Sequence, residues 1–342
     1  MNYIIKGMSQ TELEDLFINH DFPKYRGKQI YDWLYKNSAT KIEDMHNIPI
    51  KLKIFLNEYC SINTLKLSHK KNNENTVKFL FKTASNDYIE SVSMIEDNRH
   101  TICISSQVGC AVDCDFCATG KMGFKKNLNT GEIIDQLLII QNHIKIPITN
   151  IVFMGMGEPF LNYKNVIKAA DLMNDQKGLN FSYHRITIST SGIVPKINQF
   201  INDKLKYNLA ISLNAADDKT RDKLMPINKK WPIKDLLNIA SIYNKLHRSK
   251  LTFEYVLINS INDSSADAEK LSQLLRNSDC KLNIIPFNEI GNEYNRPSIE
   301  KIENFIKVLN HSRKGFSILV RWSKGTKINA GCGQLATEIN NE

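Results

Sequence analysis

The chain has 342 residues, of which 42% are hydrophobic, and its 45 basic and 36 acidic side chains give a formal net charge of +9. No apolar run approaches the ~20 residues that a membrane-spanning helix requires. The N-terminus has a charged residue as early as Lys6 and lacks the pattern of a secretion signal. We therefore expect a cytoplasmic protein with reduced cysteines and no membrane contact. The positive charge suits a polyanionic partner but does not by itself establish one.

The first third of the chain predicts two small units. Apolar side chains at helical spacing indicate a helical accessory domain over residues 1–62. Residues 63–95 are expected to form a β extension, with strands at 77–81 and 88–92 and a polar turn at 70–75.

Strand-like apolar runs then alternate with helical segments over residues 96–330. This alternation predicts an α/β fold whose parallel sheet closes fully or partly into a barrel. In such barrels the reactive groups lie at the C-terminal ends of the strands. Residues 331–342 follow as a C-terminal segment. The expected strands are 101–104, 148–154, 185–189, 208–213, 251–258, 281–286 and, as a further candidate, 316–321.

A closely spaced set of cysteines carries the most specific chemistry. Cys110, Cys114 and Cys117 form a C-x3-C-x2-C pattern, which can hold a four-iron cluster and leave one iron without a protein ligand. Such an iron can bind S-adenosylmethionine (SAM), whose cleavage yields a carbon radical. A structural zinc site is the weaker interpretation, because Cys103 or Cys332 would have to supply the fourth ligand from a distance.

Polar residues follow several of the expected strands. The glycines of the segment Gly155–Glu158 allow close approach to a ligand, and Glu158 could accept a hydrogen bond from the amino group of SAM. Hydroxyls and amides at Ser189, Ser212–Asn214 and Asn288 would suit ribose and carboxylate groups.

Three groups of basic residues adjoin these motifs. If the barrel brings them to one rim, they would form a cationic mouth for the phosphate backbone of a nucleic acid. Trp33, Trp231 and Trp322 are expected to pack rather than to stack on bases. The basic groups are Lys121, Lys125 and Lys126; Lys219, Arg221, Lys223, Lys229 and Lys230; and Arg313, Lys314, Arg321, Lys324 and Lys327.

Over nearly its whole length the chain resembles the radical SAM RNA adenine methyltransferases, a family that comprises the RlmN enzymes and the related Cfr resistance enzymes. The resemblance rests on the cysteine triplet and on Ser105–Cys110, Gly155–Pro159, Leu224–Asn228 and Ala330–Leu335. It implies a partial (βα)6-type TIM barrel of the radical SAM class, a [4Fe-4S] cluster on the triplet, and a helical accessory domain that binds RNA.

The activity implied by this resemblance is methylation of C2 of adenine 2503 in 23S rRNA and of adenine 37 in some tRNAs. C2 is an electron-poor carbon that cannot attack the SAM methyl group directly, so a radical route is required. The resemblance implies that Cys332 first accepts a methyl group as a nucleophile. A radical made from a second SAM activates this methyl group for addition to the adenine, and Glu90 removes the C2 proton. Cys103 then releases the product by forming a transient disulfide with Cys332.

Further assignments follow from the same resemblance. Asn214 stands where family members often carry histidine, and Gly331 stands where they carry alanine. The expected partners are 23S rRNA, tRNA, and an electron donor such as flavodoxin or ferredoxin. Three alternatives stay open, namely methylation of C8, a radical SAM enzyme with a non-RNA substrate, and a metal-stabilised RNA-binding module. The implied SAM contacts are Gly157, Glu158, Ser189, Ser212, Leu213, Asn214 and Asn288.

Overall fold

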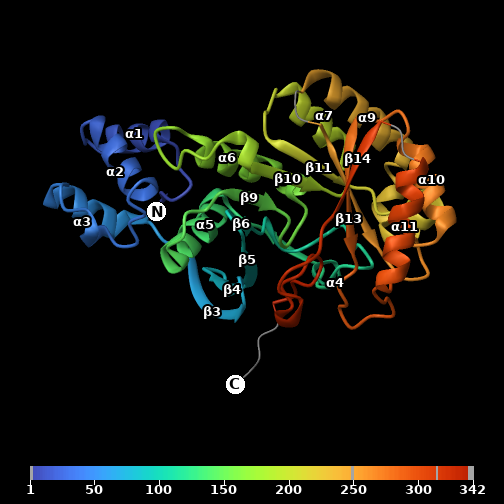
Figure 1. Ribbon diagram of the computed structural model, residues 1–342. Coiled ribbons are helices and arrows are strands. Elements are labelled where there is room, and N and C mark those ends of the chain that lie inside the picture. Colours follow the sequence, from blue (N-terminus) through green and yellow to red (C-terminus); the bar gives the residue numbers. More distant parts are fainter. Residues whose placement is uncertain (1–2, 248–249, 313–314, 338–342) are drawn as a thin grey trace.

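The structure is a computed structural model that describes residues 3–247, 250–312 and 315–337 (Figure 1). Its main sheet has the strand order β14-β13-β12-β11-β10-β9-β6-β5-β4-β3. A helical module lies at one side of this sheet, and further helices cover the barrel portion (Figure 1). Within the described residues, no helix is long and apolar enough to cross a membrane.

The N-terminal module is mainly helical, as expected. At the start of α1, Ser9 Oγ accepts a hydrogen bond from the Glu12 N–H while the Glu12 carboxylate accepts one from the Ser9 N–H, so the two residues form a capping box. Leu13 and Phe17 bury the inner face of α1. The elements are β1 (Tyr3–Ile4), α1 (Gln10–Ile18), α2 (Tyr25–Tyr35), η1 (Ile42–Asp44), α3 (Ile50–Tyr59) and β2 (Cys60–Ser61).

A buried carboxylate fastens this module to the barrel. Asp135 lies on α5 (Thr130–Ile144), and its Oδ2 accepts hydrogen bonds from the backbone N–H and the hydroxyl of Thr64, both at 2.6 Å. The Lys6 Nζ lies 3.4 Å from Asp135 Oδ1, and both side chains are almost fully buried. Separating the two residues would leave an unpaired charge buried, which is costly. The ion pair therefore holds the start of the module, at Lys6, against α5 of the barrel.

The β extension is an antiparallel stretch formed by β3 (Leu65–Asn73), β4 (Thr76–Thr83), β5 (Tyr88–Glu96) and β6 (Arg99–Cys103). The predicted polar turn at 70–75 is wrong, because β3 continues to Asn73 and the chain turns at Glu74, which has φ 50. β3 forms the end of the sheet, where polar side chains can face solvent, so its polarity resembles that of a loop.

The barrel portion is a parallel sheet that begins with β6. The strands expected from the sequence are confirmed. β6 and the next five strands match the expected (βα)6 pattern, and β14 adds one more parallel strand. β14 forms one end of the sheet, so the barrel is partial. The strands are β9 (Asn150–Phe153), β10 (Ile186–Thr190), β11 (Asn208–Ser212), β12 (Thr252–Leu257), β13 (Cys280–Pro286) and β14 (Phe316–Val320).

The helices of the barrel bury apolar faces against these strands, which explains why the strands read as apolar runs in the sequence. They are α5, α6 (Tyr163–Asn174), α7 (Val194–Asn202), α8 (Asp218–Leu224), α9 (Ile233–Leu246), α10 (Ser265–Leu275) and α11 (Ile299–Ser312). Short 3-10 turns lie between them at η2 (Pro159–Asn162), η3 (Tyr183–Arg185) and η4 (Pro226–Lys229).

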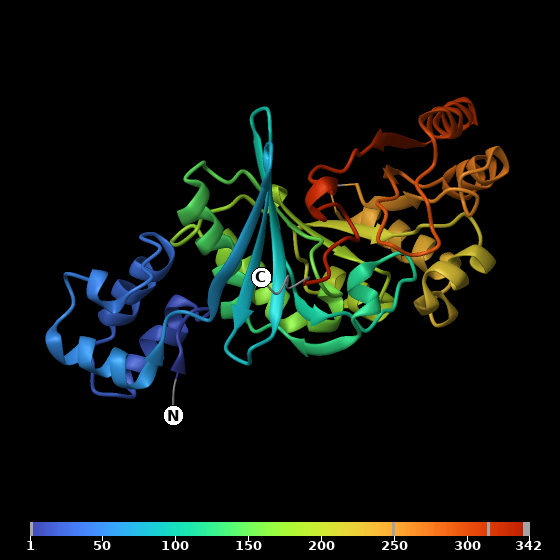
Figure 2. The ribbon, with the colours of Figure 1, turned by 90° about the horizontal axis from the view of Figure 1, so that it is seen from below.

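The last described segment crosses the open side of the barrel. After β14 the chain passes through η5 (Thr326–Ile328) and runs toward the β extension, where the Ala336 N–H donates to Glu90 Oε2 at 3.1 Å. Figure 2 shows this segment between the last strands and the extension. It carries Cys332 into the barrel.

The domain boundaries at residues 62, 95 and 330 remain a proposal, and residues 338–342 lie outside the described part.

Candidate active site

One cavity of about 560 Å³ occupies the inside of the partial barrel. The cysteine triplet, Cys103 and Cys332 all contribute to its wall. These cysteines come from the β6 strand end, the loop that follows it and the C-terminal segment. The fold therefore brings five of the seven cysteines of the chain to one place.

The triplet lies in the loop between β6 and α5. This loop starts with a hairpin of β7 (Gln107–Gly109) and β8 (Phe124–Asn127), and α4 (Ala118–Lys121) follows Cys117. Gly109 has φ 70, and a Cβ at this position would lie 1.7 Å from the Gly123 carbonyl oxygen. Only glycine allows the two arms to approach this closely.

The triplet fits an iron–sulfur cluster. Burial, with further contributions from nearby anionic groups that include Cys117 and Glu158, raises the pKa of Cys110 to about 12, and burial with the charges of the other two cysteines raises that of Cys114. A cluster would supply the positive charge that keeps such thiolates deprotonated. Among the described residues, no three His, Cys, Asp or Glu side chains are arranged to hold a single metal ion. In a [4Fe-4S] cluster each thiolate would bind a different iron.

The second group of thiols is Cys103 and Cys332. Cys103 ends β6 and is buried, and burial followed by the charge of Cys332 raises its pKa to about 12. Cys332 reaches solvent through the open cavity, but the surrounding protein still raises its pKa to about 11. Each thiol therefore loses its proton less readily than an ordinary cysteine, and the two lie close enough for their charges to interact.

Glu90 lies on β5, beside the C-terminal segment rather than in the cavity wall. It is 2% exposed, so it is not the solvent-exposed edge carboxylate that its place in the sequence permits. Its Oε1 is 2.9 Å from Lys78 Nζ, which is also buried. Its Oε2 accepts the backbone N–H of Ala336, so the carboxylate lies against the segment that carries Cys332.

The glycine-rich end of β9 packs against the cluster hairpin. The Glu158 N–H donates to Gln107 Oε1 at 2.8 Å, and Gly157, with φ 97, leaves no room for a Cβ beside Gln107. The Glu158 carboxylate is buried and accepts the backbone N–H groups of Phe160 and Ser191. Burial raises the pKa of Glu158 in spite of these hydrogen bonds.

The other expected SAM residues divide into two groups. Gly157, Glu158, Ser189, Ser212 and Asn214 line the cavity. Leu213 and Asn288 lie outside its wall: Leu213 is fully buried, and the Asn288 Nδ2 donates to Ser323 Oγ at 2.8 Å and to the Cys332 carbonyl oxygen at 2.9 Å.

Asn214 and Gly331, which depart from the family pattern, both have structural roles. Asn214 has φ 58, and its Oδ1 accepts the Val256 N–H at 2.8 Å, so the side chain joins β11 to β12. A Cβ at Gly331 would lie 2.7 Å from Gln334 Oε1 and 2.9 Å from Asn288 Nδ2. The glycine therefore permits a close contact beside Cys332.

Sequence analysis missed an ion pair between a buried carboxylate and a partly exposed arginine in the cavity. Glu254, on β12, accepts the Ser189 hydroxyl at 3.0 Å, and its Oε1 lies 3.8 Å from Arg321 Nη1. Both side chains line the cavity, and their charges act on Cys103 and Cys332. In the sequence, this ion pair is indicated only by the acidic residue Glu254 within the otherwise apolar strand Thr252–Leu257.

The expected cationic mouth is present only in part. Lys121 pairs with Asp115, Lys125 with Asp87 and Lys126 with Glu132. Arg221 is fully buried and cannot face RNA. Its guanidinium donates to the carbonyl oxygens of Leu213, Ser191 and Ser212 and to Asn228 Oδ1 at 2.8–2.9 Å. It therefore holds the ends of β10 and β11 together. Arg321 and Lys324 do line the cavity, whereas Arg313 and Lys314 lie outside the described residues.

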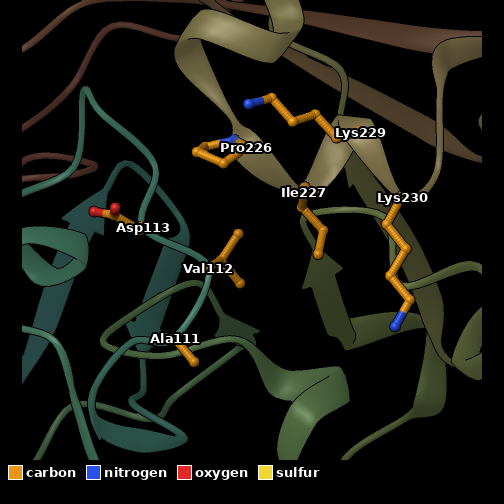
Figure 3. A pocket seen from close by; sticks show the side chains of 7 residues that line it. All are labelled: Ala111, Val112, Asp113, Pro226, Ile227, Lys229 and Lys230. Atoms are coloured by element: carbon orange, nitrogen blue, oxygen red, sulfur yellow. The ribbon is translucent and has the colours of Figure 1, made fainter.

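A second concave surface of about 490 Å³ lies on the other side of the cluster loop (Figure 3). Ala111, Val112 and Asp113 form one wall, and the opposite wall is formed by Pro226 and Ile227 with Lys229 and Lys230. Val112 also lines the large cavity. The loop between β6 and α5 that carries the cysteine triplet, which we call the cluster loop, therefore separates the two spaces. We call this surface the cluster-loop groove.

Comparisons with known proteins agree with this geometry. The radical SAM superfamily model matches residues 104–271, and the model of the ribosomal RNA large subunit methyltransferase N-terminal domain matches residues 4–62. The dual-specificity RNA methyltransferase RlmN of Geobacter sulfurreducens is 41% identical over 338 residues, which cover 98% of this chain and 92% of that protein. RlmN of Desulfosudis oleivorans is 42% identical over 340 residues, covering 98% and 91%.

A solved structure is similar over the same length. The radical SAM methyltransferase from Sphaerobacter thermophilus has a TM-score of 0.95 and 38% identity, covering 98% of this chain and 100% of that one. The similarity includes the helical module, the partial barrel and the C-terminal segment, because nearly the whole chain is aligned. The fold class expected from the sequence is thereby confirmed.

Proposed function

We propose that this chain, which belongs to the RlmN family of dual-specificity RNA methyltransferases, methylates C2 of adenine 2503 in 23S rRNA and C2 of adenine 37 in some tRNAs. Like other radical SAM enzymes it uses a [4Fe-4S] cluster and SAM. We further propose that Cys110, Cys114 and Cys117 hold the cluster and that the polar strand ends from Gly157 to Asn214 bind SAM, with Leu213 and Asn288 supporting them. The cytoplasm, where rRNA and tRNA are made, is the proposed place of action.

The observation that carries this proposal is the presence of two further thiols in the cavity of the cysteine triplet. A cluster and SAM suffice to generate a radical. A small-molecule radical enzyme has no evident use for Cys103 and Cys332 beside them. A methyl carrier and a resolving thiol, in contrast, need this proximity.

A [4Fe-4S] cluster held by Cys110, Cys114 and Cys117 would supply the electron that cleaves SAM to a carbon radical, which would remove a hydrogen atom from the methyl group on Cys332; the cluster would also take back the one unpaired electron after the methyl-derived carbon has added to C2. The chain itself contributes three groups. The Cys332 thiolate attacks the methyl carbon of a first SAM, which leaves as S-adenosylhomocysteine. After the methyl-derived carbon has joined C2, Glu90 accepts the C2 proton. The Cys103 thiolate then attacks the Cys332 sulfur; an S–S bond forms, the S–C bond to the product breaks, and its electron pair stays on the departing carbon and takes up a proton.

Glu90 suits the role of base through its position. It contacts the segment of Cys332 through Ala336, and its Oε1 lies 2.9 Å from Lys78 Nζ. C8 methylation is the second candidate. Val108 and Pro159 favour C2 through family resemblance alone.

We propose the cluster-loop groove as the docking surface of the electron donor. One wall, Ala111–Asp113, lies between the cluster cysteines Cys110 and Cys114, and Lys229 and Lys230 are exposed on the opposite side. Lysines would attract an acidic carrier such as flavodoxin or ferredoxin. An electron entering here would leave the large cavity free for RNA.

Nucleoside mass spectrometry tests the main proposal. Anaerobically reconstituted enzyme is incubated with SAM, dithionite and deproteinised 23S rRNA, and the nucleosides are separated after digestion. We expect 2-methyladenosine. The appearance of 8-methyladenosine instead would reassign the carbon, and the absence of both would refute an RNA substrate.

A further inference from the structure

Trp322 differs from the other two tryptophans in its surroundings. Trp33 and Trp231 pack against the hydrophobic core, as the sequence led us to expect. Trp322 follows β14 on the wall of the large cavity and is 48% exposed. Its neighbour on the same wall, Leu319, is 61% exposed. A large aromatic ring left half exposed forfeits much of the stabilisation that its burial would give, so the expectation of a packing role is wrong for Trp322.

One face of the indole already has a partner. The Arg296 guanidinium lies over the ring, with its central carbon 5.4 Å from the ring centroid. This cation–π contact restrains the ring. Trp322 is nevertheless 48% exposed, so about half of its surface stays open to a further flat group.

The position of Trp322 is fixed relative to Cys332. The next residue, Ser323, accepts a hydrogen bond from the Asn288 side chain, and the same amide nitrogen donates to the Cys332 carbonyl oxygen. Asn288 is 3% exposed, so these bonds are protected from water. The ring and the reactive cysteine are thus two fixed points of one segment.

The surroundings of the ring suit RNA rather than an apolar partner. Arg321 and Lys324 flank Trp322 in the sequence, and Arg99 lines the same cavity. Arg321 lies 3.8 Å from Glu254 and Lys324 lies 3.4 Å from Glu96, but Lys324 remains half exposed and Arg321 about one third exposed. Arg99 lies close enough to Arg321 for their charges to interact unfavourably. Basic side chains around an exposed aromatic ring are the arrangement by which proteins hold single-stranded nucleic acid.

We propose that Trp322, backed by Arg296, is a stacking platform for the nucleobase next to the target adenine. This inference depends on the proposed RNA substrate. An adenine can reach Cys332 only after it leaves its base stack, and this removes a stacking partner from its neighbour. The exposed surface of Trp322 replaces that partner at the entrance of the cavity. Trp322 is then a positioning residue for RNA.

Fluorescence of a single-tryptophan holoenzyme tests the contact. Trp33→Phe and Trp231→Phe leave Trp322 as the reporter. The probe is a 23S rRNA fragment that contains the target adenine, together with two copies that carry an abasic site on its 5′ or its 3′ side. We expect the intact fragment to quench Trp322 and one of the abasic copies to fail to do so. Quenching that is unchanged by both abasic sites would overturn the proposal.

Binding of variants provides the second test. Trp322→Ala should weaken the Kd for the intact fragment about 5- to 150-fold, since stacking contributes ~1–3 kcal/mol per base. Trp322→Phe should recover most of the affinity, whereas Trp322→Leu should not. For the abasic copy that fails to quench Trp322, the Trp322→Ala change should weaken RNA binding little further. Equal affinities of the Leu and Phe variants would indicate a merely apolar contact and refute stacking.

Two controls separate this inference from the proposed function and from misfolding. Phe124→Ala removes a ring that is 47% exposed on β8, away from the residues that line the cavity, and should change the Kd less than about twofold. Trp322→Ala should still accept a methyl group on Cys332 from SAM, measured as a mass increase, and should raise KM for RNA more than it lowers kcat. If wild-type enzyme methylates the RNA and Trp322→Ala has the same KM, the stacking proposal is refuted but the proposed function is not. If wild-type enzyme neither binds nor methylates the RNA, the proposed function fails.

Discussion

Cys103 and Cys332 come from opposite ends of the barrel sequence, yet the charge of Cys332 helps to raise the pKa of Cys103. β6 fixes Cys103 in the wall, and the C-terminal segment is held in place by the bonds of Gly333 to Ala118 and of Ala336 to Glu90. The structure thus places one free thiol on the sheet and a second on a separately anchored segment, both in the wall of one cavity.

Removing either thiol should stop the reaction at a different stage. Cys332→Ala should still bind the cluster, judged by its iron and sulfide content, but should form no methylated nucleoside. Cys103→Ala should accumulate a covalent complex of enzyme and RNA, visible as a retarded band in a denaturing gel. Cys280→Ala is the matched control, because Cys280 is a buried thiol with a pKa also raised to about 12 but lies away from the cavity. Free product from Cys103→Ala would refute its resolving role.

The raised thiol pKa values predict a pH dependence. In cluster-free protein, iodoacetamide should alkylate Cys332 about tenfold faster for each pH unit from 7 to 10, because the thiolate fraction rises until the pKa of about 11 is reached. Urea-unfolded protein should instead level off above ~8.5, the ordinary thiol pKa. Peptide mass spectrometry measures both rates. A plateau near pH 8.5 in folded protein would contradict the raised pKa.

The same shift affects stability in a defined direction. A folded pKa above the unfolded value means that the folded protein holds the proton more tightly. The stabilisation from Cys332 is therefore fully present below about pH 8.5 and is lost as the pH rises through about 11.

The sequence predicted the parts of the fold that depend on local pattern. The strands of the barrel are apolar because helices cover them, and the cysteine spacing identifies the cluster loop without any tertiary information. Side chains whose role depends on burial were not predictable in this way. In the sequence Arg221 looks like one more surface basic residue beside Lys219 and Lys223. Only the fold shows that its guanidinium donates hydrogen bonds to buried carbonyl groups. Trp322 reads as core, although β14 leaves it on the cavity wall.

Glu90 and Lys78 allow stability and chemistry to be separated. Glu90→Gln leaves the buried Lys78 ammonium without its ion-pair partner, which should lower the free energy of unfolding by about 3–5 kcal/mol, and it should abolish methylation. The double variant Glu90→Gln/Lys78→Met should recover most of the stability in urea unfolding, because no unpaired charge remains. Methylation should stay absent, and its return in the double variant would exclude Glu90 as the base.

Arg221 should support SAM binding through the backbone of two strand ends. Arg221→Lys keeps the charge but cannot reach the carbonyl oxygens of Leu213, Ser191 and Ser212 together. Buried carbonyl groups without donors cost ~1–3 kcal/mol each, so we expect lower stability in urea unfolding and a SAM Kd at least about tenfold weaker by calorimetry. Lys219→Ala, an exposed change on the same helix, should leave both within error. Equal SAM affinities of the two variants would contradict this role.

The cluster-loop groove should be required for protein electron donors and not for chemical reductants. Lys229→Glu/Lys230→Glu reverses the charge of one wall, so reduced flavodoxin should bind more weakly and support methylation at a rate lower by about tenfold or more. Turnover with dithionite should stay near wild type, because a small reductant needs no docking surface. Wild-type binding of flavodoxin should weaken as salt increases, whereas that of the variant should depend less on salt. Equal losses with both reductants, accompanied by weaker RNA binding, would show instead that these lysines contact RNA.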